Sequence, residues 1–177
     1  SLEIFPPKPE TPIDTIYNTI DALSDLKPEF ISVTYGAGGS SKSHTVQIAD
    51  IIKNKYGIEA LAHLTCVNST AVEIEDILQR LQTSNIENVL ALRGDKPQDS
   101  SCAAVQEPEY KYAKDLIAHV KSFGNFSIGA ACYPEVHVEA KDSISDLLNL
   151  KAKVKSGADF LITQLFLDNN FFYDFKE

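Results

Sequence analysis

The sequence predicts an α/β fold, a (β/α)8 TIM barrel that is here truncated after about six strands. Strand-like and helix-like segments alternate with a period of about thirty residues, which requires parallel strands joined by right-handed crossovers. An open doubly wound sheet satisfies the same pattern. The barrel is favoured because every strand ends in polar residues, and in a barrel these ends converge on one mouth. The residues are Glu3, Thr34, His63, Arg93 with Asp95, Tyr133 with His137, and Gln164.

Six short apolar runs have the length and composition of buried strands. In the clearest one, a cation and a carboxylate follow the apolar residues as Arg93 and Asp95, on either side of Gly94. A packed strand with charged groups at its tip holds those groups still beside a ligand. The structural alternative is a solvated ion pair at a strand end. The six runs are Ser1–Phe5, Phe30–Tyr35, Glu59–Thr65, Asn88–Arg93, Ser127–Tyr133 and Phe160–Phe166.

Helices are predicted between the strands from apolar residues at helical spacing. The first helix is expected to start at Thr11 as N-cap with Pro12 at its first position, and the third at Ser69 or Thr70. Glycines are expected just after the second, fourth and fifth helices. These glycines are Gly57, Gly124 and Gly157.

Two loops stand out. The segment Gly36–Ser41 is rich in glycine but lacks the GxGxxG spacing, so it gives weak support to a dinucleotide-binding Rossmann fold. The segment from Gly94 to about Glu107 is longer than ordinary strand-to-helix connections, and long loops in compact domains are usually functional or mobile.

Composition narrows the classes of partner. The net charge of −9 and the pI near 4.9 argue against nucleic acid and anionic membrane surfaces, because both repel an acidic protein. No apolar run reaches the length of a membrane-spanning helix, and the sequence shows no signal-peptide pattern. Cys66, Cys102 and Cys132 are odd in number and form no CxxC pair, which predicts reduced thiols in a cytoplasmic protein.

The chain is expected to be one catalytic barrel domain over residues 1–177, with the C-terminal strand–helix units missing. It stops inside an apolar helical pattern near Phe171, and it contains no methionine. A sheet with too few strands to close has exposed edges, which promote association. A homo-oligomer is therefore expected.

Glu3 is the candidate general acid, because its apolar neighbours would favour a protonated carboxyl near neutral pH. Arg93 suits a phosphate or a ring oxygen, and Asp95 suits the amino edge of a pyrimidine ring. The structural alternatives are an ion pair or a solvated carboxylate for Glu3 and a salt bridge between Arg93 and Asp95. Histidines His63 and His137 lack the spacing of a zinc site, so no metal is predicted.

Seven motifs, in this order and spread over essentially the whole chain, resemble those of methylenetetrahydrofolate reductases. They are Leu2–Pro7 (LEIFPP), Ser32–Ala37 (SVTYGA), His63–Cys66 (HLTC), Ala91–Asp95 (ALRGD), Tyr133–His137 (YPEVH), Asp146–Lys151 (DLLNLK) and Ile162–Phe166 (ITQLF). The resemblance implies a (β/α) barrel with non-covalent FAD. It also implies reduction of 5,10-methylenetetrahydrofolate to 5-methyltetrahydrofolate, in one-carbon metabolism and methionine synthesis, with electrons from NADH or NADPH.

The resemblance also implies roles for individual residues. Glu3 matches the general acid that opens the five-membered ring of the folate, and Asp95 and Gln164 match folate contacts. In one departure, Ala152 stands beside Lys153 where the family often has an arginine that contacts FAD. The flavin-binding positions are matched by Thr34, Tyr35, Ala37, His63, Arg93, Gly94, Asp95, Tyr112, Ala113, Tyr133, His137, Ala140, Asp146, Asn149 and Lys153.

Two other classes of function remain open from the sequence. One is a barrel enzyme without redox chemistry, such as an aldolase or a metal-dependent hydrolase. The other is a regulatory barrel that binds a ligand without catalysis. A bound flavin would separate the reductase from both.

Overall fold

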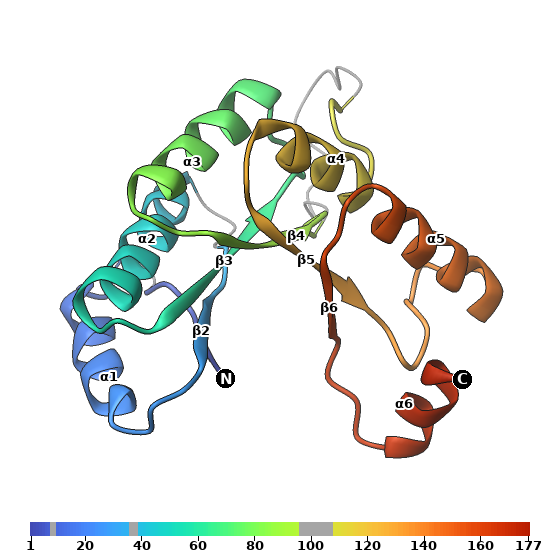
Figure 1. Ribbon diagram of the computed structural model, residues 1–177, viewed down its shortest axis with the longest axis horizontal. Coiled ribbons are helices and arrows are strands. Elements are labelled where there is room, and N and C mark those ends of the chain that lie inside the picture. The colour runs from blue at the N-terminus through green and yellow to red at the C-terminus, as the bar shows by residue number, and fades with distance from the viewer. Residues whose placement is uncertain (8–9, 36–38, 96–107) are drawn as a thin grey trace.

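A computed structural model describes residues 1–7, 10–35, 39–95 and 108–177, except the side chains of residues 39–43. Six parallel strands alternate with helices, and the strands form one curled sheet with the helices on its outer side (Figure 1). The predicted α/β class is confirmed. The strands are β1 (Leu2–Ile4), β2 (Phe30–Val33), β3 (Glu59–Thr65), β4 (Asn88–Leu92), β5 (Ser127–Cys132) and β6 (Phe160–Thr163).

The order of the strands decides between the two candidate topologies. Each strand pairs in parallel with the next one along the chain, from β1 to β6. A doubly wound sheet would reverse its strand order at a switch point and carry helices on both faces. The sheet has neither feature, so the doubly wound alternative is wrong and the chain forms a curled, half-barrel arrangement.

The helices fill the connections between the strands. Their bounds are α1 (Asp14–Ser24), α2 (Gly39–Asp50), α3 (Ala71–Thr83), α4 (Ala113–Phe123), α5 (Ser143–Lys155) and α6 (Asn169–Lys176). A π-helical segment, η1 (Ile51–Lys55), continues α2 and was not predicted. None of the helices that the structure describes is long and apolar enough to cross a membrane.

Two helix starts test the predicted caps. Thr70 caps α3 through a capping box: its hydroxyl accepts from the backbone N–H of Glu73, and the Glu73 carboxylate accepts from that of Thr70. The prediction for α1 is wrong, because its N-cap is Ile13 rather than Thr11. The chain already turns before the helix, where the Thr15 N–H donates to the carbonyl of Pro12. The start of α1 therefore has no side-chain cap.

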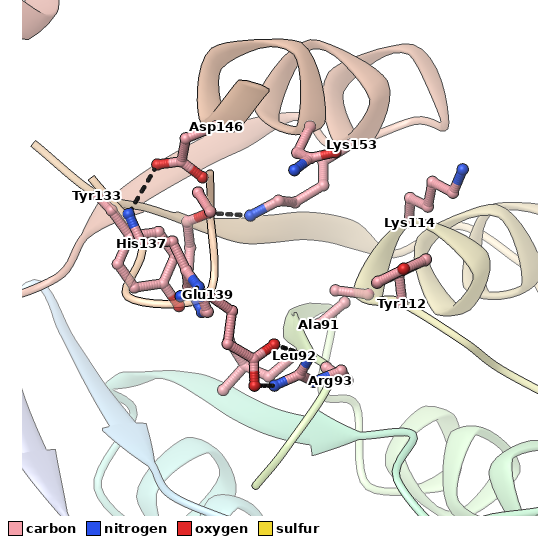
Figure 2. Close-up of a pocket in the computed structure, with 14 residues that line it drawn as sticks. Ala91, Leu92, Arg93, Tyr112, Lys114, Tyr133, His137, Glu139, Asp146 and Lys153 are labelled. Carbon is pink, nitrogen blue, oxygen red and sulfur yellow. Dashed lines mark hydrogen bonds and ion pairs between the residues drawn. The ribbon is translucent and has the colours of Figure 1, made fainter. Parts of the chain in front are cut away.

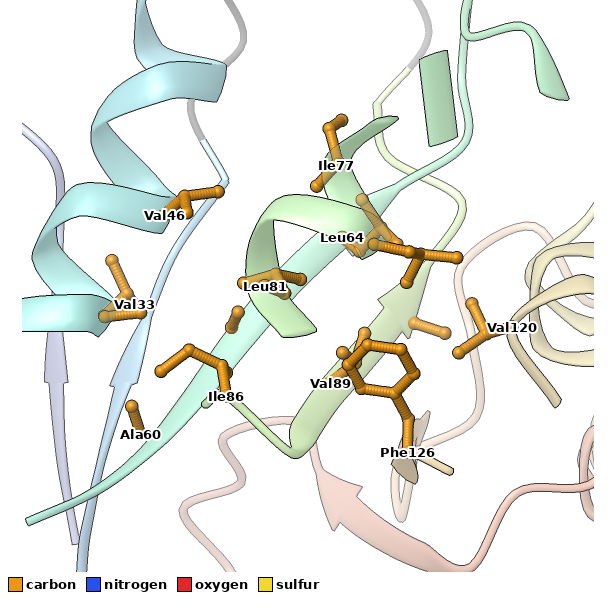
Figure 3. Packing of buried hydrophobic residues seen from close by; sticks show 14 of the residues in the cluster. Val33, Val46, Ala60, Leu64, Ile77, Leu81, Ile86, Val89, Val120 and Phe126 are labelled. Carbon is orange, nitrogen blue, oxygen red and sulfur yellow. The ribbon is translucent and has the colours of Figure 1, made fainter. Parts of the chain in front are cut away.

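The core lies between the sheet and the outer helices (Figure 3). Alternate residues of the strands β2 to β5, such as Val33, Leu64 and Val89, face the helices and are almost fully buried. The residues between them face the concave side of the sheet, among them Ser32 and His63. The pleat therefore sorts each strand into one face that stabilises the fold and one face that is available for a site.

Apolar side chains remain exposed around β6, α5 and the segment that leads to α6. The most exposed are Val138, Leu165 and Leu167, and the apolar residues of α5 are exposed as well, namely Ile144, Leu147, Leu148 and Val154. No residue of α5 or α6 is buried. The packed part of the molecule is therefore centred on β2 to β5.

Candidate active site

Chemistry-bearing residues gather at the carboxyl end of the parallel strands. Backbone hydrogen bonds hold the strand exits together there: Val67 N–H donates to Arg93 O at 2.8 Å, and Gln164 N–H donates to Cys132 O at 2.8 Å. Asp95 follows the first pair directly, and both Asp95 and Gln164 are exposed. The parallel, sequential sheet places these strand ends along one edge, and their convergence on the mouth of a closed barrel stays a prediction.

The first part of the site is a cluster of Glu3, Ser32 and His63 on the concave face. Neighbouring strands supply them, because Glu3 of β1 is in register with Ser32 of β2, and His63 lies on β3. The Ser32 hydroxyl donates to Glu3 Oε2 at 3.1 Å, and His63 Nε2 lies 3.5 Å from the same oxygen. Ser32 and His63 are buried, whereas the Glu3 side chain is 48% exposed. The half-exposed carboxyl group of Glu3 thus lies on the concave face, against the buried polar side chains of Ser32 and His63.

Burial lowers the pKa of His63 below its ordinary value near 6.5, and the charge of Glu3 partly opposes that effect. The folded protein therefore disfavours the protonated imidazole more than the unfolded chain does. As pH falls below 6.5 the unfolded chain takes up the proton more readily, so the stability contributed by neutral His63 is lost.

We expect the melting temperature of the protein to fall between neutral pH and about pH 5, and His63→Gln to flatten this dependence. Thermal unfolding of both proteins across this range measures the difference. Equal slopes would contradict the assignment of the pH dependence to His63.

The second part of the site is a pocket of about 330 Å³ between the exits of β4 and β5 and the helices α4 and α5 (Figure 2). It includes nine predicted flavin-binding residues: Arg93, Tyr112, Ala113, Tyr133, His137, Ala140, Asp146, Asn149 and Lys153. It also includes five residues that were not predicted: Ala91, Leu92, Lys114, Ala131 and Glu139.

Arg93 is held in the pocket wall by Glu139. The guanidinium makes two bonds to the carboxylate, Nη1 to Oε2 at 2.6 Å and Nη2 to Oε1 at 3.0 Å (Figure 2). This pair raises the pKa of Arg93, so the guanidinium is a permanent cation. The salt bridge considered between Arg93 and Asp95 is absent among the described ion pairs, because the side chain turns toward Glu139 instead. Glu139 lies two residues after His137, and that proximity was the only sequence signal for it.

Lys153 reaches from α5 into the pocket as a half-buried cation. Its Nζ donates to Ala131 O at 2.6 Å and lies 5.6 Å from the centre of the Tyr133 ring. Burial lowers the pKa of Lys153, while Asp146 raises it in part. Within the described chain the ammonium has one hydrogen-bond acceptor for its three donors. An anionic or acceptor-rich ligand would satisfy the remaining donors.

The loop between β5 and α5 is held in a fixed shape. Asp146 accepts a hydrogen bond from the His137 backbone N–H at 3.0 Å (Figure 2), and His137 Nδ1 accepts from the backbone N–H of Glu139 at 3.0 Å. Neutral His137 must then carry its proton on Nε2 and act as a donor through that atom. Val136 has φ of 70°, a conformation that costs a β-branched residue about 1–3 kcal/mol. The hydrogen bonds of the loop offset this strain, and Tyr133 and His137 remain on the pocket wall.

Gly94 joins the two parts of the site. Its φ is 85°, and a Cβ atom there would lie 2.7 Å from Val67 Cγ1. Only glycine has both the backbone freedom and the space for this close approach. The exit of β4 therefore passes close to that of β3, and Asp95 follows directly after this close approach.

The remaining flavin predictions fall outside the pocket. Thr34 follows β2, where its carbonyl accepts from the Thr45 hydroxyl at 3.0 Å. Tyr35 packs against the helix-side core, and burial raises its pKa to about 12. Its hydroxyl is buried with no hydrogen-bond partner among the described residues, and strand alternation places it on the same side as Val33. Ala37 lies outside the described residues.

The described residues contain no group of histidine, cysteine and carboxylate side chains that could hold a metal ion. Cys66 and Cys132 are buried free thiols, and burial raises the pKa of Cys66 to about 11. Such thiols are poor nucleophiles. The described site therefore offers the carboxyl group of Glu3 on the concave face. In the pocket it offers the imidazole donor of His137 and the cations Arg93 and Lys153.

Comparison with known proteins places the chain in a family. The sequence model of methylenetetrahydrofolate reductase matches residues 1–177. The 5,10-methylenetetrahydrofolate reductase of Escherichia coli is 44% identical over 177 residues, which are 100% of this chain and 58% of that protein. The Pectobacterium carotovorum protein of the same name is 42% identical over 177 residues, which cover 57% of it.

A plant relative and a solved structure extend the comparison. Methylenetetrahydrofolate reductase (NADH) 1 of Arabidopsis thaliana is 38% identical over 186 residues, with 99% of this chain and 31% of that protein covered. A muconate cycloisomerase from Azorhizobium caulinodans shares the fold, with a TM-score of 0.54 at 12% identity, over 92% of this chain and 38% of that chain. The chain spans about 58% of the length of its bacterial relatives. It belongs to the methylenetetrahydrofolate reductase family.

Proposed function

We propose that the protein containing this chain reduces 5,10-methylenetetrahydrofolate to 5-methyltetrahydrofolate, using FAD and a nicotinamide donor. The names of its relatives support this reaction, and the plant relatives named as NADH-dependent support NADH as the donor, with NADPH as the alternative. The observation that carries the proposal is that one parallel sheet presents the carboxyl group of Glu3 on β1 and the cation-lined pocket at the exits of β4 and β5. Such an arrangement offers a proton donor and a cofactor site on the same sheet.

The proposal includes a closed eight-stranded barrel. Residues 1–177 would supply six of its strands as part of a single catalytic domain, and the sequential parallel order of the strands supports this. The exposed apolar side chains near β6 and α5 are the surface that further strand–helix units would cover. A cytoplasmic homo-oligomer is proposed with it.

FAD suits the pocket by the chemistry of the residues that line it. Arg93 and Lys153 offer positive charge to the phosphates, and Lys153 has unused donors. His137 Nε2 and the rings of Tyr112 and Tyr133 offer a hydrogen-bond donor and flat surfaces to the planar groups. When bound, the flavin supplies the hydride chemistry of the reaction, and the protein supplies binding, orientation and protons.

Thr34, Tyr35, Ala37, His63, Gly94 and Asp95 remain proposed flavin contacts outside the pocket. The concave face beside Glu3 and His63 is the proposed place for the reactive ring, because β3, which carries His63, pairs with β4, whose exit lines the pocket. Asp95 and Gln164 are proposed folate contacts, and their exposure at these exits leaves them accessible to a substrate. Tyr35 is the contact that the geometry supports least, because its side chain faces the helices.

Glu3 is the proposed general acid. As a carboxylic acid it gives its proton to a nitrogen of the folate five-membered ring as the carbon–nitrogen bond breaks and the bonding electrons pass to that nitrogen. Glu3 is left as a carboxylate, and the ring carbon becomes an iminium that accepts hydride. The Ser32 hydroxyl remains a donor to Glu3 Oε2 before and after the transfer.

The proposal is tested on the purified full-length protein. We expect a yellow protein that releases FAD on denaturation, whose flavin is bleached by NADH or NADPH and recoloured by 5,10-methylenetetrahydrofolate. Stopped-flow absorbance measures the two half-reactions separately and identifies the donor. A colourless protein that binds no flavin, or one that gains an aldolase or hydrolase activity on addition of metal, would overturn the proposal.

A further inference from the structure

The carboxyl group of Glu3 has two oxygens in different surroundings. Oε2 accepts from the Ser32 hydroxyl at 3.1 Å and lies 3.5 Å from His63 Nε2. Oε1 makes no hydrogen bond within the part of the chain that the structure describes. The two buried side chains thus converge on one oxygen, and the described chain offers no hydrogen-bond partner to the other.

Ser32 is positioned to keep Oε2 of Glu3 in its hydrogen bond and Oε1 free of one. It is only 6% exposed, and its backbone is locked in register between Glu3 on β1 and Leu61 on β3. Its hydroxyl also lies 3.4 Å from the Leu2 carbonyl, so it sits directly over β1. A short side chain on a paired strand has little freedom, which makes it a precise reference for a longer and half-exposed glutamate.

We propose that Ser32 is a positioning residue that holds Oε2 of Glu3, so that Oε1 is the oxygen that carries the transferred proton. This inference rests on the proposed general-acid role of Glu3. In the acid form Oε1 is the hydroxyl and Oε2 the carbonyl oxygen that accepts from Ser32. After the proton passes to the folate nitrogen, the same hydrogen bond stabilises the carboxylate that remains.

His63 completes the arrangement without taking part in the proton transfer. Its Nε2 is buried and has no hydrogen-bond partner among the described residues, although Glu3 Oε2 lies nearby. Burial disfavours its protonation. The hydroxyl of Ser32 is therefore the described group that donates to Glu3, and its removal leaves the carboxyl free to rotate.

Ser32→Ala tests the inference in the flavin-loaded, full-length protein. We expect the rate of folate reduction to fall roughly tenfold, the loss typical of one hydrogen bond to a charged group, while flavin reduction by the nicotinamide is unchanged. We also expect the loss to fall on kcat for folate reduction, with the KM for the folate unchanged, because a misplaced carboxyl group impairs proton transfer rather than binding. A purely structural role would not give this split.

Two further variants make the result specific. Ser69→Ala removes another buried hydroxyl, which has no hydrogen-bond partner among the described residues, and we expect it to leave both half-reactions unchanged. In a Glu3→Gln background, Ser32→Ala should cause no further loss, because Ser32 acts through the carboxyl group. If Ser32→Ala does not retain flavin, Ser32→Cys preserves the volume with a weaker donor and should show the same selective loss.

The outcomes separate the two proposals. If the unsubstituted protein does not reduce the folate, the proposed function fails. If it does, and Ser32→Ala or its cysteine replacement matches Ser69→Ala in both half-reactions, only the role of Ser32 is overturned. Additive losses in the double variant with Glu3→Gln would overturn it as well.

Discussion

Replacing Glu3 by glutamine is expected to lower folate reduction about a hundredfold or more, while the flavin is still reduced by the nicotinamide at the unsubstituted rate. The amide keeps the size of the side chain and can still accept from Ser32, but it has no acidic proton to give. The nicotinamide half-reaction needs no proton from this position. Anaerobic stopped-flow absorbance of the flavin follows both half-reactions in the same preparation.

Glu73→Gln is the matched control for this experiment. Glu73 belongs to the capping box of α3, so its replacement perturbs a helix end without touching the concave face. We expect it to lower the melting temperature and leave both half-reactions unchanged. Equal losses of both half-reactions in Glu3→Gln would show that Glu3 maintains the site as a whole, which contradicts an acid role.

Replacing Lys153 by methionine is expected to weaken FAD binding by roughly tenfold to a hundredfold, which is the loss of one to two charge-assisted hydrogen bonds. The substitution keeps an unbranched side chain in the pocket but removes the ammonium beside Tyr133 and Asp146. Because burial already disfavours the charge of Lys153, we expect the flavin-free variant to be no less stable than the unsubstituted protein. Titration of flavin fluorescence and thermal unfolding without flavin measure the two effects.

Lys151→Met provides the control for Lys153. It lies on the same helix two residues earlier, is exposed, and does not line the pocket. We expect its flavin affinity to be unchanged. If both lysine variants lost the same affinity, the effect would be one of overall charge, and the assignment of the pocket to the cofactor would be contradicted.

The sequence predicted the strands well because parallel strands buried on both sides are continuous apolar runs. The third strand was predicted over Glu59–Thr65 and is observed over the same residues. The choice of a curled sheet over a doubly wound one followed from polar residues at every strand end. Polar residues at every strand end are expected in a curled parallel sheet, because the carboxyl ends of all its strands border the same opening.

Local features that depend on neighbours were not predicted. The π-helical turn at Ile51–Lys55 comes from a backbone bond between Tyr56 N–H and Ile51 O, which no propensity in this segment indicates. Thr11 has the chemistry of a cap, but the turn formed by Pro12 and Ile13 moves the start of α1 past it. The start of a helix depends on the backbone conformation of the residues before it, and the sequence pattern at Thr11 did not indicate that conformation.

The candidate site also contains residues that were predicted from the sequence and contacts that were not. Nine predicted residues line the pocket, because they lie at the exits of β4 and β5, in the loop after β5, or on the helices α4 and α5 that border the pocket. The partnership of Arg93 with Glu139 joins residues far apart in sequence, so it required the fold to be seen. Tyr35 could have been corrected from the sequence, since two-residue alternation already places it with Val33 on the helix side.

The most direct test of the account is a crystal structure of the full-length protein with FAD and a folate bound. We predict that the flavin spans from the pocket beside Arg93 and Lys153 to the concave face beside Glu3, with the folate between the flavin and the Glu3 carboxyl group. A flavin bound at the opposite end of the strands, next to Glu29, Glu59 and Glu87, would contradict it.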